Sequence, residues 1–188
     1  MKIKIVAVIG AGTMGHAIAL VHAIGGCSVR LQDINKETLG AAVGLVGAAC
    51  ATLRKAGEID LAGAEAAMGR IEYTSSLAEA VKSADLIVEA VVENKKIKQE
   101  LFAAINELAP STAIIASNTS YLDIFPLVPE ALQARTAIAH WYTPPYIVDL
   151  VDIAPGPHTA PEVVKTLHAL YVEFGKAPQM FNQLIPGY

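Results

Sequence analysis

Residues 4–35 read KIVAVIGAGTMGHAIALVHAIGGCSVRLQDIN, and this stretch decides the fold. Its hydrophobic pattern predicts a β-strand over 5–9, a helix that follows a glycine-rich turn and ends near residue 24, and a second strand over 27–31. Asp33 follows the second strand, eighteen positions after Gly15 (33 − 15). A strand, a GxGxxG turn, a helix, a strand and an acidic residue in this order are typical of a dinucleotide-binding βαβ unit. A glycine-rich turn without a ligand is the alternative, and the match of the whole unit makes it the weaker one.

Each glycine of the turn has a physical role in such a unit. Gly10 permits the tight turn, Gly12 lets the backbone approach a pyrophosphate, and Gly15 lets the helix pack close to the strand. The N-terminus of the helix adds free N–H groups and the positive end of the helix dipole. We therefore predict that the turn binds the cofactor through Gly10, Gly12, Thr13, Met14 and Gly15.

Composition and charge exclude several classes of protein. The 188 residues favour one domain, and a formal net charge of −4 with no basic block argues against a nucleic-acid partner. Cys27 and Cys50 have no CxxC spacing, and four of the five histidines show no ligand spacing, so we expect reduced thiols and no metal site. We find no apolar stretch long enough to span a bilayer, and we expect a cytoplasmic protein with no membrane partner.

The chain is unusually apolar for its size. Hydrophobic residues make up 53% and charged residues only 17%, against about 25% charged in typical domains. The mean hydropathy is +0.43. This excess predicts surface that another subunit or a further domain covers.

Strands and helices alternate along the whole chain. Further strands are predicted over 70–74, 85–92, 113–116, 136–139, 148–153 and 178–182. Helices are predicted over 36–68 with a break near 57–60, and over 77–81, 95–108 and 160–174. The alternation predicts an α/β fold of the Rossmann type, a doubly wound and mostly parallel sheet with helices on both faces, over residues 1–183.

Polar residues gather at the predicted carboxyl ends of the strands. In an open α/β sheet, ligands bind outside these ends. The residues predicted there are Asp33, Glu93, Ser117, Asn118, Ser120 and His140. The sequence therefore predicts one site along this edge, with the Asp33 carboxylate placed to accept the hydroxyls of an adenosine ribose.

Several longer motifs carry a family resemblance. They are VIGAGTMG (8–15), ADLIVEAVVENKKIKQELF (84–102), ASNTS (116–120), and His140 followed by LVDI (150–153). Together they make the chain similar, over nearly its entire length, to the NAD-binding domain of the L-3-hydroxyacyl-CoA dehydrogenase family. The stretch HWYTPPYIVDLVDIAPGP (140–157) resembles the branch of L-gulonate 3-dehydrogenase (lambda-crystallin) and carnitine dehydrogenase. That branch oxidises free hydroxy acids rather than thioesters.

The resemblance implies NAD as cofactor and assigns residues to it. Asp33 would bind the adenosine ribose and select NAD over NADP, and Glu93 and Lys98 would lie at the nicotinamide-side ribose. Ser120 would contact both the cofactor and a substrate oxygen. Thr143 stands where the family has asparagine, so this cofactor-binding position keeps a hydroxyl but loses the amide. For Glu93 and Lys98 the alternative is an exposed helix start.

The resemblance also implies the chemistry, which is oxidation of a secondary alcohol in fatty acid metabolism or a related pathway. His140 matches the catalytic base, and Asp152 falls where the family has a glutamate that orients the histidine. Aspartate is one methylene shorter. A structural histidine at a strand end is the alternative for His140, and the catalytic interpretation is favoured because Asp152 is predicted on the adjacent strand and Ser120 at a neighbouring strand end.

Residues 184–188 match the start of a linker in the family. The family continues there into an all-helical domain that closes the substrate cleft and makes the dimer. We therefore expect a small hydroxyacyl substrate, and either a homodimer or docking to a C-terminal helical domain that this chain does not contain.

Three functions remain open from the sequence. The first is an NAD-dependent dehydrogenase of a 3-hydroxyacyl-CoA or 3-hydroxy acid, the second an NAD-binding module without turnover, and the third a structural, crystallin-like protein. The His140–Asp152 pair argues against the third. Tyr142 and Tyr146 could line a substrate pocket or only pack the loop.

Overall fold

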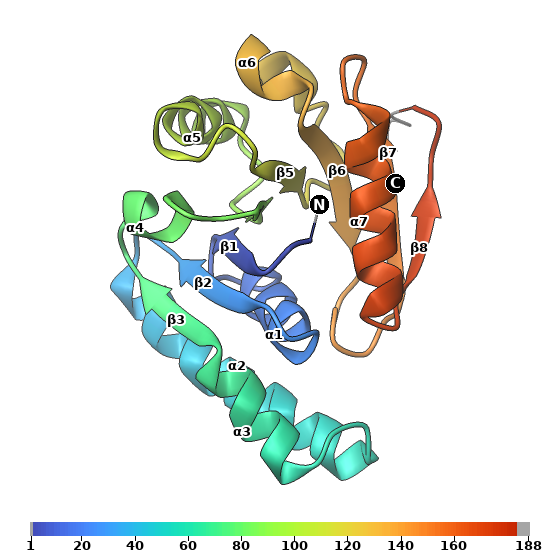
Figure 1. Ribbon diagram of the computed structural model, residues 1–188. Helices are drawn as coiled ribbons and strands as arrows, with labels where there is room; N and C mark the ends of the chain where they lie inside the picture. Colours follow the sequence, from blue (N-terminus) through green and yellow to red (C-terminus); the bar gives the residue numbers. More distant parts are fainter. Residues whose placement is uncertain (1, 184–188) are drawn as a thin grey trace.

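One eight-stranded sheet, in the order β3-β2-β1-β4-β5-β6-β7-β8, organises the computed structural model, which describes residues 2–183 (Figure 1). The strands are β1 (Ile5–Ile9), β2 (Ser28–Gln32), β3 (Ile71–Thr74), β4 (Leu86–Glu89), β5 (Ile114–Ser117), β6 (Thr136–Trp141), β7 (Leu150–Pro155) and β8 (Ala177–Met180). The helices are α1 (Gly15–Ile24), α2 (Lys36–Ala56), α3 (Leu61–Gly69), α4 (Leu77–Val81), α5 (Lys95–Leu108), η1 (Phe125–Leu127), α6 (Glu130–Gln133) and α7 (Pro161–Glu173). The predicted linker over 184–188 lies outside the described residues.

Strands β1 to β6 are all parallel, and they lie in the order 3-2-1-4-5-6 that characterises Rossmann folds. Strand β7 then pairs antiparallel with β6, and β8 pairs parallel with β7. The predicted mostly parallel, doubly wound sheet is confirmed.

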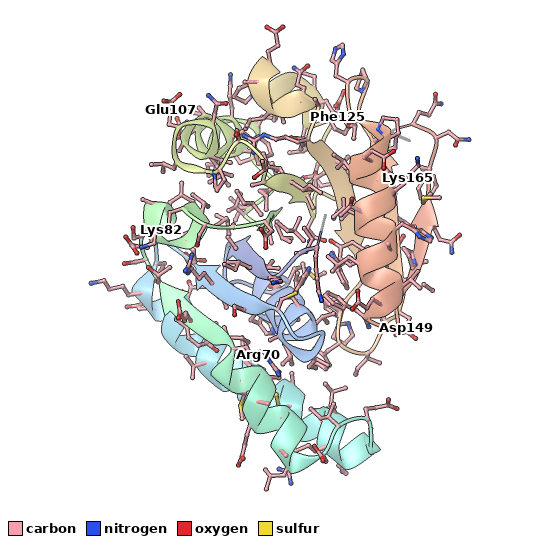
Figure 2. All side chains as sticks on the ribbon, viewed as in Figure 1. Arg70, Lys82, Glu107, Phe125, Asp149 and Lys165 are labelled. Atoms are coloured by element: carbon pink, nitrogen blue, oxygen red, sulfur yellow. The ribbon has the colours of Figure 1, made fainter. Side chains whose placement is uncertain are left out.

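Alternate residues of each strand face two different halves of the core. Val6 and Val8 of β1 pack with α1, α2, α3 and α7, whereas Ala7 and Ile9 pack with α4, α5 and η1. This is the period-two pattern of a strand buried on both faces, and it explains why the strands read as continuous apolar runs. Charged side chains such as Lys82, Glu107 and Lys165 project from the periphery (Figure 2).

Short polar side chains begin four of the helices. Asn35, Asp60, Ser76 and Asn94 each accept hydrogen bonds from backbone N–H groups in the first turn of α2, α3, α4 and α5. The long predicted helical region breaks as expected, because Gly57 ends α2 with a φ of +79°. The α5 bounds agree with the predicted 95–108.

Most strand bounds differ from the prediction by one to three residues, and two of these differences have a local reason. The predicted strand over 85–92 stops at Glu89, because the Glu89 carboxylate accepts a hydrogen bond from Val91 N (2.9 Å) and turns the chain out of the sheet. The predicted strand over 136–139 continues to Trp141, because β7 pairs with it as far as the Trp141–Val151 position.

Helix α2 corrects one expectation. By length and composition alone, its 21 residues could cross a bilayer. The expectation that no apolar stretch is long enough to span a bilayer is therefore wrong. In the structure α2 packs on α1 and α3, burying Leu39, Val46 and Leu53. Core helices meet the same two criteria, so length and composition alone do not indicate a membrane. Val43 and Leu45 on its other face are exposed.

Both cysteines are buried free thiols, as predicted. Burial raises the pKa of Cys27 to about 11 and also raises that of Cys50. Both thiols therefore stay protonated, and thus weakly reactive, at neutral pH.

Candidate active site

The turn between β1 and α1 has the backbone that the glycine pattern predicts. Gly10 has a φ of +98°, and a Cβ atom there would lie 2.5 Å from the carbonyl oxygen of Ala90. A Cβ atom at Gly15 would lie 1.7 Å from the carbonyl oxygen of Gly10. In contrast, a Cβ atom at Gly12 would meet nothing within 4 Å. The first and third glycines are therefore required by the fold, while the second leaves open space beside the backbone, as a pyrophosphate needs.

Asp33 lies beside this turn. Its Oδ2 accepts a hydrogen bond from Ala11 N (2.9 Å), and its Oδ1 accepts one from Asn35 N (2.9 Å). These two backbone donors fix the carboxylate at the carboxyl end of β2, next to the turn. The prediction that Asp33 and the glycines share one site is consistent with this geometry.

A cavity of about 520 Å³ adjoins Asp33 and the turn. Gly10, Gly12 and Asp33 are among the residues that line it. Its apolar side includes Ile34, Val92 and Ile97, and all three are exposed in the structure. A carboxylate beside an apolar slot suits a nucleoside, because the sugar hydroxyls can bond the carboxylate while the flat base covers the apolar side chains.

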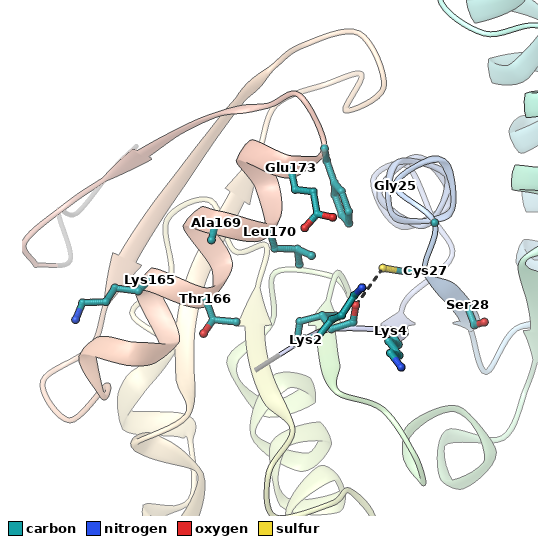
Figure 3. A pocket seen from close by; sticks show the side chains of 13 residues that line it. Lys2, Lys4, Gly25, Cys27, Ser28, Lys165, Thr166, Ala169, Leu170 and Glu173 are labelled. Atoms are coloured by element: carbon teal, nitrogen blue, oxygen red, sulfur yellow. Dashed lines mark hydrogen bonds between the residues drawn. The ribbon is translucent and has the colours of Figure 1, made fainter.

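A larger cavity of about 800 Å³ lies elsewhere (Figure 3). It is bordered by Lys2 and Lys4 before β1, by Cys27 and Ser28 at the start of β2, and by α7. This is the amino end of these strands, opposite the glycine turn. The cavity shares no residue with the predicted site, so cavity size alone does not mark the site.

A buried ion pair supports the ends of β4 and β5. Lys98 Nζ lies 2.6 Å from Glu89 Oε1, and the two side chains are 1% and 0% exposed. Glu89 also accepts hydrogen bonds from Ser117 Oγ and from Val91 N. The alternative of an exposed helix start is therefore wrong for Lys98. Sequence reasoning missed Glu89, although a single carboxylate in the otherwise apolar run LIVEAVV was a usable signal.

Glu93 connects this pair to the loop after β5. Its Oε1 accepts hydrogen bonds from Thr119 Oγ1 (2.7 Å) and Ser120 N (2.6 Å), and its Oε2 lies 3.1 Å from Lys98 Nζ. Burial opposes the charged form of Glu93, but these two hydrogen bonds and the Lys98 charge outweigh it and lower the pKa of Glu93. Glu93 is thus an anion that holds Ser120 in place.

His140 and Asp152 are directly opposite each other in the β6–β7 pair. Both lie on the same face of the sheet as the pair Ile138 and Ala154. His140 is two residues nearer than Ile138 to the carboxyl end of β6. His140 Nδ1 is 4.0 Å from Asp152 Oδ2. Burial lowers the pKa of His140, and the charges of Asp152 and Glu93 oppose this without cancelling it. His140 is therefore neutral at pH 7.

Tyr142 is a further neighbour of this pair. Its hydroxyl donates a hydrogen bond to Asp152 Oδ2 (2.6 Å), and its ring meets the His140 ring edge to face at 4.8 Å between centroids. The hydrogen bond raises the pKa of Tyr142 to about 12. Sequence reasoning could not separate Tyr142 from Tyr146, because only the side-chain position decides between a site residue and a packing residue.

The remaining predicted residues differ in how they are placed. Thr13 and Thr143 are exposed, whereas Met14 packs partly against the core. Asn118, at the end of β5, accepts a hydrogen bond from Trp141 N (2.8 Å) and so ties the Ser120 loop to the strand that carries His140.

The fold and this site together define a Rossmann-type dinucleotide-binding domain. The family model for the 3-hydroxyacyl-CoA dehydrogenase NAD-binding domain matches residues 5–183, and the chain belongs to this family. Its cofactor is NAD. The family prediction from the sequence motifs is confirmed.

Individual relatives agree with this assignment. The chain is 32% identical over 187 residues to 5-formyl-3-hydroxy-2-methylpyridine 4-carboxylate 5-dehydrogenase of Mesorhizobium japonicum, covering 99% of the chain and 60% of the relative. It is 30% identical over 185 residues to the human lambda-crystallin homolog, covering 97% of the chain and 58% of the relative. The solved structure of Escherichia coli 3-hydroxybutyryl-CoA dehydrogenase superposes with a TM-score of 0.89 at 32% identity, covering 96% of this chain and 38% of that one. The chain thus spans less than two thirds of the length of each.

Proposed function

We propose that this chain supplies the NAD-binding and proton-transfer residues of a dehydrogenase that oxidises the hydroxyl of an L-3-hydroxyacyl-CoA or related 3-hydroxy acid to the ketone. The observation that carries the proposal is the placement of His140 opposite Asp152, at the sheet edge where Glu93 also holds Ser120. A structural histidine has no need of a carboxylate across the strand pair and a second anion nearby.

In this proposal His140 acts as the general base. Its neutral Nε2 takes the proton of the substrate hydroxyl as the C–H bond breaks, and the resulting imidazolium is stabilised by the Asp152 carboxylate on the Nδ1 side. The bound nicotinamide ring supplies the acceptor for the hydride. In ketone reduction the same imidazolium returns the proton. A lowered pKa of His140 keeps the basic form populated at neutral pH.

The cofactor assignments extend this proposal. The open side of Gly12 and the N-terminus of α1 would hold the pyrophosphate, and Asp33 the adenosine ribose. Glu93, held by Thr119 and Lys98, would face the nicotinamide-side ribose, and Ser120 would hold the substrate oxygen. Thr13, Met14 and Thr143 complete the proposed cofactor-binding set. Lys98 contributes through Glu93, because its own ammonium group is buried.

The length of the relatives supports a proposal about partners. The chain covers 60% of one relative and 58% of another, and exposed apolar side chains such as Val43 and Leu45 line α2. We propose that a further domain or a second copy completes the substrate cleft and covers apolar surface. A stable contact would bury about 800 Å² per partner. Sedimentation of a clean monomer over a wide concentration range, without hydrophobic dye binding, would count against it.

The test of function is a panel of 3-hydroxyacyl-CoA and free 3-hydroxy acid substrates with NAD, on this chain and on a form extended beyond Tyr188. His140→Asn is expected to lower turnover by roughly 10²–10⁴-fold, the usual contribution of an acid–base group, with NAD affinity unchanged. His158→Asn, an exposed histidine in the turn after β7, is the matched control and should behave as wild type. Near-normal turnover by His140→Asn would remove the proposed mechanism and favour an NAD-binding module.

A further inference from the structure

We propose that Tyr142 is a positioning residue, whose hydroxyl holds the Asp152 carboxylate and thereby limits how strongly Asp152 acts on His140. This inference rests on the proposed role of His140 in proton transfer. It gives a function to a side chain that the family resemblance did not assign.

The geometry brings three side chains to one oxygen atom. Tyr142 Oη donates to Asp152 Oδ2 at 2.6 Å, and His140 Nδ1 is 4.0 Å from the same oxygen. Tyr142 follows two residues after His140, so both side chains lie on one side of the strand path and reach the same carboxylate. Trp141 between them faces the other way, into the core with α1 and α7. The phenol thus makes the short contact, and the imidazole makes the long one.

The chemistry of the carboxylate explains why this matters. A phenol hydrogen bond of this length draws negative charge toward the donor and stabilises the anion. Asp152 therefore attracts an imidazolium less than an uncommitted carboxylate would. Because the pKa of Tyr142 is raised to about 12, its hydroxyl remains a donor throughout the range in which a histidine titrates. The aspartate side chain is also short, so its reach toward His140 is set by what else it binds.

The other charges around His140 come from two directions. Asp152 faces it from β7, and Glu93 acts on it from the loop after β4. Lys98 lies 3.1 Å from Glu93 and 2.6 Å from Glu89, so its charge is shared and offsets that second carboxylate only in part. Burial favours the neutral ring against both anions. Asp152 has the larger effect of the two anions, and the hydrogen bond from Tyr142 limits how much of the Asp152 charge acts on His140.

The direct test is an NMR titration of the His140 ring in the isolated chain, which needs neither cofactor nor turnover. The His140 signal is assigned by its loss in His140→Asn. Tyr142→Phe keeps the ring contact and removes only the donor, and we expect the pKa of His140 to rise by roughly one unit. Tyr146→Phe removes a hydroxyl four residues further along the loop and should leave the titration unchanged.

A double variant tests whether Tyr142 acts on His140 through Asp152. In Asp152→Asn the pKa of His140 should fall below the wild-type value, and adding Tyr142→Phe to that variant should have no further effect. An unchanged pKa in Tyr142→Phe, or an equal rise with and without the Asp152 carboxylate, would overturn the inference.

The titration of Tyr142→Phe and the turnover of His140→Asn distinguish a failure of this inference from a failure of the proposed function. If Tyr142→Phe shifts the titration while His140→Asn keeps normal turnover, the coupling exists but has no role in catalysis, and both the mechanism and the positioning role fail. If His140→Asn abolishes turnover and Tyr142→Phe shifts nothing, the mechanism stands and only the role of Tyr142 fails. If both hold, the acid limb of alcohol oxidation in Tyr142→Phe should move to higher pH by the same amount as the titration.

Discussion

Two pairs of a carboxylate and a nitrogen base lie near the carboxyl edge of the sheet, Glu89 with Lys98 and Asp152 with His140. In the first, the charged atoms are 2.6 Å apart and both side chains are fully buried. In the second, His140 Nδ1 and Asp152 Oδ2 are 4.0 Å apart, and the Tyr142 hydroxyl donates a hydrogen bond to the same carboxylate oxygen. A buried pair at contact distance is costly to separate, so it fixes the ends of β4 and β5. A pair with a gap, built on a histidine whose pKa is lowered by burial, leaves the base neutral and able to accept a proton.

The largest expected effect comes from breaking the tight pair. Lys98→Met would leave the Glu89 carboxylate buried without its counter-ion, which should reduce the free energy of unfolding by about 3–5 kcal/mol. Lys96→Met is the matched control, because Lys96 is exposed and its ion pair with Glu100 is long, at 3.9 Å. This variant should change stability by less than about 0.5 kcal/mol. Urea unfolding measures both.

A double variant sharpens that result. Glu89→Gln combined with Lys98→Met removes both charges of this pair, and it should recover part of the lost stability because the fully buried Glu89 carboxylate is no longer left unpaired. Equal unfolding midpoints for Lys98→Met and Lys96→Met would show that the pair does not have the structural role given to it.

A second histidine, His22, shows what burial does where no carboxylate of residues 2–183 acts on the ring. His22 is fully buried among Trp141, Tyr171 and Phe174, and its Nδ1 lies 2.8 Å from Ile18 O. Burial lowers its pKa from 6.5 to about 4. The unfolded chain therefore binds the proton at higher pH than the folded chain does.

The sign of the pH dependence follows from this difference. The stability linked to His22 is fully present above pH 6.5 and is lost as the pH falls from 6.5 to about 4, with a total of about 3 kcal/mol. His22→Leu should remove this component. Urea unfolding of both proteins at pH 7 and pH 4.5 tests it, and an identical pH dependence of the two would contradict the assignment.

The sequence predicted most of the fold and the placement of Asp33 beside the glycine turn. The glycine turn and Asp33 belong to a local pattern, in which a few neighbouring residues determine the backbone. The Glu89–Lys98 pair was missed because its two residues meet only after β4 turns into α5. The net direction of the His140 pKa was also not predictable, because it is a balance between burial and carboxylates that only the packed structure sets.

A third carboxylate, Asp33, differs from both pairs, because its partners among residues 2–183 are two backbone N–H groups. If it binds the adenosine ribose, Asp33→Ala should weaken NAD binding by about 1.5–3 kcal/mol, roughly 10- to 150-fold. The wild-type chain should bind NADP more weakly than NAD, because a 2′-phosphate would meet the carboxylate. Nucleotide fluorescence measures both, with Asp60→Ala on the distant α3 cap as control. NADP binding as tight as NAD binding would show that Asp33 has another role.

The pH dependence of alcohol oxidation is the most direct test of whether His140, paired with Asp152, transfers the proton. With an identified substrate, turnover should be constant at neutral pH and should fall as the pH drops through a pKa below 6.5, because protonated His140 cannot accept the hydroxyl proton. Ketone reduction should show the opposite limb and fall as the pH rises. The residual turnover of His140→Asn should lack this limb. An acid limb that persists unchanged in His140→Asn would contradict the account.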